Sequence, residues 1–480
     1  MTQPTRRTHH QVTFAVLALA VVAYSLLQSL IAPVLPTIMV NLHTNQTTVT
    51  WVVTTYLLSA SIFTPILGRI GDAVGKKKML LVALGALAVG SVLSGLSTGI
   101  ETMIVARAIQ GVGGGILPLA FGIVRDEFPR AKVSDAIGVL AALIAVGAGL
   151  GMVLAGPIVD LLGYHWLFWL PAIMVLLAAT AAVFFVPESP SRSASRISVL
   201  SALLLSMWLV CLLLALSEAP KWGWTSGRVI GLLAGAVVLA MAWILVETRA
   251  ASPLVDMRMM RLPAVWTTNL VALLIGVGMY AFSAFVPQFV QTPPTAGYGF
   301  GASITESGLI LLPFSVMMFV TGLASGRLGA RFGSKAVVVA GTALAVVPFI
   351  MLAFVHDYEG VLYTATAVMG AGFGLAFAVM ASLIVEAVPA EQAGVATGMN
   401  ANIRTIGGSI GAALMAGVVT AGVAPGDLPP ASGYTHGFLM LAGITVLALL
   451  AALVIPAARR NRAVTVHEPQ PADTRSLPAG

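Results

Sequence analysis

The chain has 480 residues, of which 58% are hydrophobic and only 9% are charged. Because soluble globular domains carry about 25% charged residues, this composition excludes a soluble protein. The net charge is +7, but the basic residues lie in short loops between apolar runs, which excludes a nucleic-acid-binding surface as the reason for it.

Apolar runs follow one another along the whole chain, and each approaches or exceeds the roughly 18–20 residues that cross a bilayer as a helix. The connections between the runs are mostly short, and no stretch is long enough for a separate soluble domain. The sequence therefore predicts an all-α polytopic membrane protein. In chain order, the predicted spans lie near residues 12–36, 50–70, 79–98, 101–124, 135–158, 165–186, 197–217, 228–248, 263–291, 304–326, 335–355, 360–385, 394–420 and 435–457.

The distribution of lysine and arginine predicts the orientation of these spans. Basic residues cluster at the N-terminus and in every second loop, whereas the other loops hold only Lys221 and Arg228. Because basic loops stay in the cytoplasm, we expect a plasma (inner) membrane protein with both termini cytoplasmic. The first run follows Arg6 and Arg7 but is too long for the core of a signal peptide, so we interpret it as the first span.

Two of the basic loops resemble each other. "GRIGDAVGKKKMLLVALG" begins at Gly68 and "GRLGARFGSKAVVVAG" begins at Gly326. Repeated halves are typical of secondary transporters, which move one bundle against the other around a central site. The repeat spacing covers eight spans rather than six, which indicates two inserted helices. The predicted domains are an N-terminal cytoplasmic segment (1–11), a six-helix bundle (12–186), two inserted transmembrane helices (187–250), a cytoplasmic linker (251–262), a second six-helix bundle (263–458) and a disordered cytoplasmic tail (459–480).

These motifs resemble those of the major facilitator superfamily, specifically its fourteen-helix drug:proton antiporters. "GRIGDAVGKKK" resembles the family's loop between helices 2 and 3, "IVARAIQGVGGG" its arginine-containing helix 4, and "TWVVTTYLLSASIFTPILGR" its second helix. The resemblance covers nearly the whole chain, to about Arg462. It implies the major facilitator fold and proton-coupled efflux of amphipathic drugs or antibiotics by alternating access.

Several polar side chains are predicted to lie inside the spans. Arg107 follows Glu101 by six residues, which places it roughly 9 Å into the membrane at 1.5 Å per residue. Intramembrane charges are functional by default, so we expect Arg107 to organise a polar layer facing a water-filled cavity. The alternative is a structural arginine that binds backbone carbonyls. The predicted cavity and substrate residues are Gln28, Tyr56, Arg107, Gln110, Asn402 and Arg404.

The resemblance implies a conformational switch in the first of the two related loops. In the resembled family, such a set of charges locks the cytoplasmic side shut when the transporter faces outward, and glycines let the two helices approach. In the second loop Ala330 replaces the aspartate, so we expect no equivalent lock there. The predicted switch residues are Gly68, Arg69, Asp72, Gly75, Lys76 and Asp126.

The sequence offers three candidates for the carboxylate that couples transport to protons. The resembled family often has an aspartate in helix 1, but Leu27 stands at that place. Glu306 begins a predicted span and either closes a capping box with Ser303 or binds a proton at the cavity mouth. The proton-coupling candidates are Glu306, Asp135 and Glu386.

Glycines recur four or five residues apart inside several spans. This spacing permits close packing of membrane helices. In helix 5 the resembled family has a glycine–proline motif, and Met152 stands at the place of the proline. The predicted packing glycines are Gly111, Gly115, Gly147, Gly151 and Gly156.

No enzyme, cofactor or metal site is predicted. "GDAVGKKK" has three residues between its glycines where a phosphate-binding loop needs four, and no Ser or Thr follows the lysine. Histidines and the single cysteine show no metal-ligand spacing. The predicted partners are a small amphipathic substrate, protons and the lipid bilayer, with no nucleic acid, and the protein is expected to be a monomer. Two other functions are left open: an exporter or flippase of a lipid or endogenous metabolite, and a transporter-like membrane sensor.

Overall fold

The computed structural model describes residues 10–188, 198–250, 253–388, 393–423 and 427–456. Within these residues every regular element is a helix. The predicted tail, 459–480, and most of the predicted N-terminal segment lie outside the described residues.

The first six predicted spans form the N-terminal half of the molecule. Two of them are interrupted by a short 3-10 turn, because small residues and a proline replace helix-forming residues there. The elements are α1 (His10–Leu30), η1 (Ala32–Val34), α2 (Leu35–Asn41), α3 (Gln46–Val74), α4 (Lys76–Gly95), α5 (Ile100–Gly111), η2 (Val112–Gly115), α6 (Ile116–Glu127), α7 (Arg130–Leu162) and α8 (Trp166–Phe185).

The remaining spans form an inserted pair and the C-terminal half. The inserted pair is α9 (Val199–Trp222) and α10 (Gly227–Arg249). The C-terminal half comprises α11 (Met257–Met260), α12 (Pro263–Gln291), η3 (Pro294–Ala296), α13 (Ile304–Phe332), α14 (Ser334–Phe354), α15 (Glu359–Ala387), α16 (Ala393–Val419) and α17 (Ala431–Val454).

The predicted spans agree with these helices to within a few residues. Thirteen helices in the described residues are long and apolar enough to cross a membrane. The remaining predicted span coincides with α7. The all-helical membrane fold predicted from the sequence is therefore confirmed.

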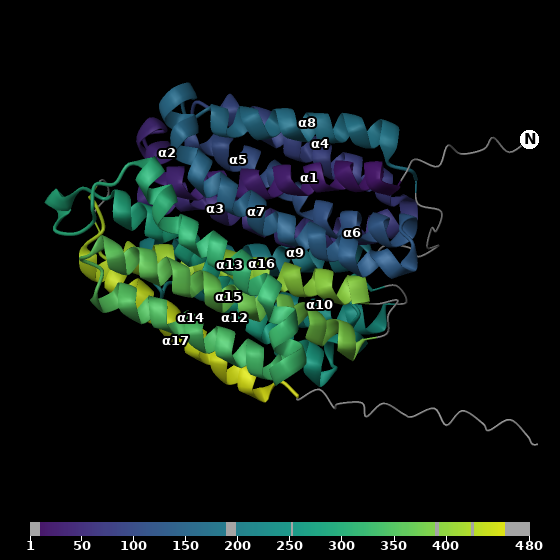
Figure 1. Cartoon of the computed structure of the whole chain (residues 1–480). Coiled ribbons are helices and arrows are strands. Elements are labelled where there is room, and N and C mark those ends of the chain that lie inside the picture. Colours follow the sequence, from purple (N-terminus) through teal and green to yellow (C-terminus); the bar gives the residue numbers. More distant parts are fainter. Residues whose placement is uncertain (1–9, 189–197, 251–252, 389–392, 424–426, 457–480) are drawn as a thin grey trace, which may run out of the picture.

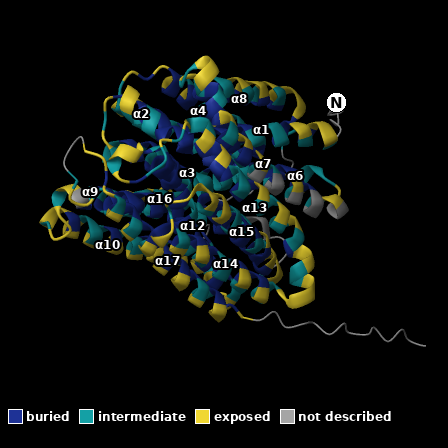
Figure 2. Ribbon diagram, turned by 60° about the vertical axis from the view of Figure 1, so that its left-hand side comes forward, coloured by how far each residue is buried: buried dark blue, intermediate teal, exposed yellow. Residues whose placement is uncertain are grey.

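The two halves form two layers of helices. In Figure 1 the purple-to-blue N-terminal half lies against the green-to-yellow C-terminal half. The layers meet where α7 packs on α13 and α3 packs on α16, while α9 packs against both α3 and α16. Figure 2 shows the buried residues concentrated between the helices and the exposed ones along the outside of the bundle, as expected for helices that face lipid.

The sides of the bundle can be named by the two related loops. Val74 at the end of α3 and Phe332 at the end of α13 lie on the same side, because an even number of spans separates them. We call this the loop side, and the other the opposite side. α1 begins and α17 ends on the loop side (Figure 1).

Candidate functional site

The two halves are joined directly on the opposite side. The Gln291 side-chain amide of α12 donates to the carbonyl of Pro33 in η1 at 2.6 Å. The Thr305 hydroxyl of α13 donates to the Asp160 carboxylate at the end of α7 at 3.2 Å. Gly156 of α7 lies directly against Thr305, so a side chain there would collide with α13. The interface is therefore closed on this side.

A cavity separates the halves on the loop side. Its volume is about 210 Å³. Asn402 of α16 lines it, is 2% exposed, and has no hydrogen-bond partner for either atom of its side-chain amide. The cavity is lined by Thr64, Pro65, Gly68, Arg69, Asp72, Lys76, Pro118, Leu119, Phe121, Gly122, Arg125, Val133, Ile137, Leu254, Gly398, Met399 and Asn402.

A buried lysine joins two carboxylates at the rim of this cavity. Lys76 is 4% exposed, and its ammonium group lies 2.6 Å from Asp126 and 3.6 Å from Asp72. Gly75 ends α3 with a positive φ of 129°, which turns the chain so that Lys76 points back at α6. The predicted switch residues thus lie together, with Gly68 and Arg69 on the cavity wall.

Arg107 lies inside the N-terminal half and is 1% exposed. Its Nε donates to the carbonyl of Val52 at 3.0 Å, and a terminal nitrogen donates to the Gln110 side-chain oxygen at 2.6 Å. The Gln110 amide in turn donates to the Ser91 hydroxyl at 3.1 Å. Neither described cavity includes Arg107. The carbonyl-binding arrangement that the sequence left as the alternative is present.

Tyr56 covers the guanidinium of Arg107. The guanidinium carbon lies 4.3 Å from the centre of the Tyr56 ring, which is a favourable cation–π distance. The Tyr56 hydroxyl is buried and has no hydrogen-bond partner. Tyr24 of α1 and Tyr280 of the C-terminal half also interact electrostatically with this hydroxyl. The predicted pair of Tyr56 and Arg107 therefore lies close to the interface between the halves.

Gln28 makes a contact between the halves. Its side-chain amide donates to the hydroxyl of Tyr280 on α12 at 3.2 Å. Tyr280 packs against the buried core of the N-terminal half, although it belongs to the C-terminal one. Gln28 thus lies at the interface, where the sequence predicted a cavity residue.

Arg404 occupies the C-terminal side of the same interface. Its guanidinium carbon lies 4.4 Å from the centre of the Phe377 ring, and its Nε is buried without a hydrogen-bond partner. Tyr280 and Tyr24 are the ionisable groups that act on it. Arg404, Tyr280, Gln28, Tyr24, Tyr56 and Arg107 form one polar layer across both halves, which we call the tyrosine–arginine layer.

The proton-coupling candidates lie elsewhere. Glu306 and Ser303 form a capping box, in which the Ser303 amide donates to the Glu306 carboxylate at 2.7 Å and the Glu306 amide donates to the Ser303 hydroxyl at 3.1 Å. The predicted capping box is therefore confirmed. Glu386 is exposed near the end of α15, and the side chain of Asp135 lies outside the described residues.

The packing glycines lie against neighbouring helices. Gly111 faces Ser59 of α3, and Gly115 faces Leu67 of the same helix. Gly147 and Gly151 both face α1, while Gly156 faces α13 as described above. At these positions a side chain would have no room, so the helices can approach closely.

Sequence reasoning missed residues whose role depends on distant contacts. The tyrosine–arginine layer is completed by Tyr24, Tyr280 and Phe377. An aromatic residue in an apolar run does not indicate that it will contact a distant arginine. Glu247 lies in the last turn of α10, where a carboxylate normally reaches the membrane interface. It is instead 2% exposed, and accepts hydrogen bonds from the Ser201 hydroxyl and from the Leu254 amide.

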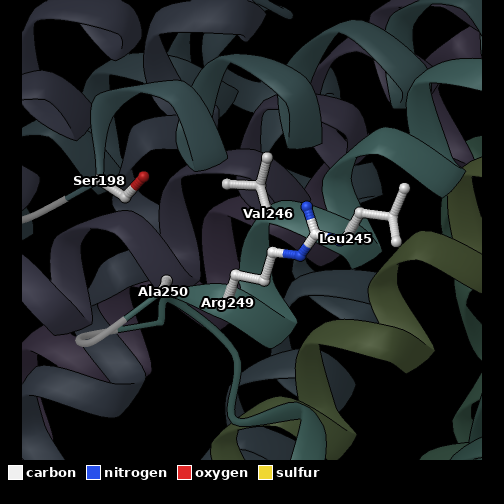
Figure 3. A pocket seen from close by; sticks show the side chains of 5 residues that line it. All are labelled: Ser198, Leu245, Val246, Arg249 and Ala250. Atoms are coloured by element: carbon white, nitrogen blue, oxygen red, sulfur yellow. The ribbon is translucent and has the colours of Figure 1, made fainter.

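A second hollow lies on the inserted pair, away from the interface. It has a volume of about 280 Å³ and is lined by Ser198, Leu245, Val246, Arg249 and Ala250. Figure 3 shows Arg249 extending along α10 toward Leu245, with Ser198 across the hollow from it. The hollow holds one charged side chain and no unpartnered buried polar atom among these residues, which makes the interface the stronger candidate site.

Comparison with known proteins agrees with this architecture. An uncharacterised transporter from Mycobacterium tuberculosis is 30% identical over 85% of this chain, which spans 59% of that protein's length. The tetracenomycin C resistance and export protein of Streptomyces glaucescens is 29% identical over 87% of this chain and 77% of its own. The solved structure of an auto-inhibited POT family peptide transporter has a TM-score of 0.66 at 18% identity, covering 96% of this chain and 99% of its own.

The family assignment rests on most of the chain. The family model described as Major Facilitator Superfamily matches residues 17–293 and 268–478, and the relatives and the fold agree with it. The chain is thus a multi-pass membrane protein, and it belongs to the major facilitator superfamily.

Proposed function

We propose that the protein exports amphipathic drugs or antibiotics from the cell by alternating access, driven by the proton gradient. The observation that carries this proposal is the asymmetry of the interface. The halves are hydrogen-bonded together on the opposite side and separated by a cavity on the loop side. Alternating access requires such an end state, with the central layer reachable from one side only.

The orientation follows from the basic loops. The loop side carries the arginines and lysines of both related loops, so we place it in the cytoplasm of a plasma membrane protein, with both termini there. Substrate would enter through the loop-side cavity and reach the tyrosine–arginine layer. We expect the monomer to be the transporting unit.

The relatives support drugs or antibiotics as the class of substrate. One carries the name of a tetracenomycin C export protein, and another, from Bacillus subtilis, that of a multidrug transporter. These names describe the relatives, and for this chain they make export of amphipathic aromatic compounds the first activity to test.

The proton carrier is sought first among Glu306, Asp135 and Glu386. Glu247 joins them because it is the carboxylate buried most deeply in the described residues. Its partner Leu254 also lines the loop-side cavity, so a change at Glu247 can reach the substrate path through that residue.

The test uses purified protein in proteoliposomes with an acidified lumen. Uptake of three fluorescent probes is followed in parallel: cationic ethidium, anionic 1-anilinonaphthalene-8-sulfonate and a neutral lipid analogue. We expect at least one dye to accumulate only while the pH gradient lasts, and a protonophore to stop it. Accumulation without a gradient contradicts proton coupling.

Two outcomes separate the proposal from its alternatives. Movement of the lipid analogue alone would indicate that the protein exports or flips lipids instead of exporting drugs. If neither dye nor lipid moves and cells expressing the protein show no antibiotic resistance, the export proposal is contradicted. The transporter-like membrane sensor is then the favoured function. Asp72→Asn serves as the internal control, since it alters the predicted switch without touching the tyrosine–arginine layer.

A further inference from the structure

The charges of the tyrosine–arginine layer do not balance. Arg107 and Arg404 both lie within spans, and neither forms an ion pair in the described part of the chain. The ionisable groups that interact electrostatically with Arg107 are Tyr56 and Tyr24. Those that interact electrostatically with Arg404 are Tyr280 and Tyr24. All are phenols, so the layer holds two positive charges and no carboxylate.

Membrane topology does not account for these two arginines. The positive-inside rule concerns basic residues in loops and at helix ends, whereas a charge inside a span is expensive and is kept for a function. The buried carboxylate of the described residues, Glu247, is held by Ser201 and Leu254 in the inserted pair. It is therefore unavailable to neutralise the layer.

The layer also has hydrogen-bond donors without acceptors. The Tyr56 hydroxyl has no partner although the residue is 1% exposed, and Nε of Arg404 is likewise buried and unpaired. A buried donor of this kind destabilises the protein when it is left unsatisfied. Both would be satisfied by an oxygen anion lying between the halves.

The residues that line the loop-side cavity also carry a net positive charge, as the tyrosine–arginine layer does. Arg69, Lys76 and Arg125 line the cavity together with the acidic residue Asp72, and Asp126 pairs with Lys76, which leaves a net positive charge. Asn402, whose amide has no partner, lines the cavity two residues before Arg404 on α16. A ligand entering here thus meets net positive charge.

We propose that the substrates are amphipathic organic anions, aromatic compounds with a carboxylate, sulfonate or ionised phenol. This inference rests on the proposed export function and names its substrate class. The anionic group lies against Arg404 and the Tyr56 hydroxyl, while the aromatic body packs on the tyrosines and Phe377. An amphipathic cation of the same shape is repelled by both arginines. Leu27, in place of an aspartate on α1, provides no charge to hold it.

The test uses two aromatic probes of similar shape and opposite charge, naphthalene-2-sulfonate and N,N,N-trimethylnaphthalen-2-aminium. Their binding to purified protein in a neutral maltoside detergent is measured by isothermal titration calorimetry, with protein-free micelles as the blank. We expect wild-type protein to bind the sulfonate at least about tenfold more tightly. Arg404→Gln should reduce that preference to about twofold or less, and Arg404→Lys should keep most of it.

A matched control separates the layer from general surface charge. Lys335→Gln removes one positive charge from the second related loop, outside the residues that line the cavity, and should leave the preference unchanged. Size-exclusion profiles and melting temperatures show whether each variant is folded.

The results that would overturn the inference are distinct from failure of export. Equal binding of the two probes, tighter binding of the cation, binding of neither, or an unchanged preference in folded Arg404→Gln protein would each refute an anion site in this layer. If ethidium is nevertheless exported in proteoliposomes, the export function stands and only the substrate class falls.

Discussion

The two related loops differ in charge although both reverse the chain in the same way. Gly75 and Gly333 end α3 and α13 with φ values of 129° and 90°, so each loop depends on a glycine for its turn. In the first loop Lys76 is buried between two carboxylates. In the second, Ser334 stands at the matching position, and no ion pair of the described residues involves this loop. The shared sequence therefore encodes the turn, and the charged cluster is a separate feature of the N-terminal half.

The first loop is also packed more tightly than the second. Gly71 lies against Leu119 and within 3.6 Å of the Lys76 backbone, measured from where its Cβ would be. The matching Gly329 has no neighbour closer than 3.8 Å, and around Gly326 the space is open to 4 Å. The first loop is thus a packed joint between α3, α4 and α6, whereas the second is loosely packed.

The same contrast extends to the two arginines of the tyrosine–arginine layer. Arg107 in the N-terminal half has hydrogen bonds to Val52 and Gln110. Arg404 in the C-terminal half has a ring contact and an unpaired Nε. Arg107 is thus bound by groups of the protein, whereas the Nε of Arg404 is available to a ligand. This difference can be tested residue by residue.

The largest expected effect comes from removing Arg107. Arg107→Ala leaves a cavity in a fully buried site and deprives Gln110 of its donor, so the free energy of unfolding should fall by about 3–4 kcal/mol. Arg404→Ala loses mainly a cation–π contact and should cost about 1 kcal/mol. Denaturation of both variants by sodium dodecyl sulfate in mixed micelles gives the comparison. Equal losses would contradict the division into a satisfied and a ligand-facing arginine.

The helices and the capping box were predictable from sequence because their signals are local. Hydropathy places α12 at Pro263–Gln291, the same residues as the predicted span, and the Ser303–Glu306 pair is a four-residue pattern. The breaks at η1 and η2 were not predicted, because Ala32–Val34 and Val112–Gly115 are as apolar as the helices around them.

The composition of the candidate site was only partly predictable. Arg107 and Arg404 stand out as charges in apolar runs, but their partners do not. Gln28 and Tyr280 are 252 residues apart, and nothing local indicates that they meet. The burial of Glu247 likewise depends on Leu254, a residue of the linker beyond α10.

The second largest effect is expected at the charged cluster of the first loop. Asp126→Asn leaves Lys76 buried with only the more distant Asp72, and removal of one partner from a buried pair is strongly destabilising. Because Asp72 can compensate in part, we expect a loss of about 2–3 kcal/mol of unfolding free energy. Lys335→Met, in the matching loop, should change it by less than about 0.5 kcal/mol. The same detergent titration measures both, and similar values would remove the contrast between the loops.

A smaller effect is expected from adding one methyl group to each loop. Gly71→Ala forces the new Cβ against Leu119, and overpacking of this kind costs about 1–3 kcal/mol, of which we expect the lower end because the leucine tip can move. In Gly329→Ala the new Cβ comes no closer than 3.8 Å to a neighbouring side chain. Because this substitution also replaces a helical glycine, it should be neutral or stabilise the protein by up to about 1 kcal/mol. Opposite signs in thermal unfolding would support the packing difference. A destabilised Gly329→Ala protein would indicate that the second loop also closes tightly.

The smallest effect is expected from copying the charges of the first loop into the second. Ala330→Asp with Ser334→Lys recreates the spacing of Asp72 and Lys76, but Ala330 is exposed, and apart from Ser334 itself the side chain that lies nearest to Gly329 is apolar Val379. An exposed pair four residues apart is worth about 0.3–0.5 kcal/mol, and a double-mutant cycle should give a coupling in that range. A coupling above about 1 kcal/mol would mean that the loop sequence alone builds the buried cluster. A value near zero would show that the cluster depends on Asp126, which α6 supplies from 50 residues away.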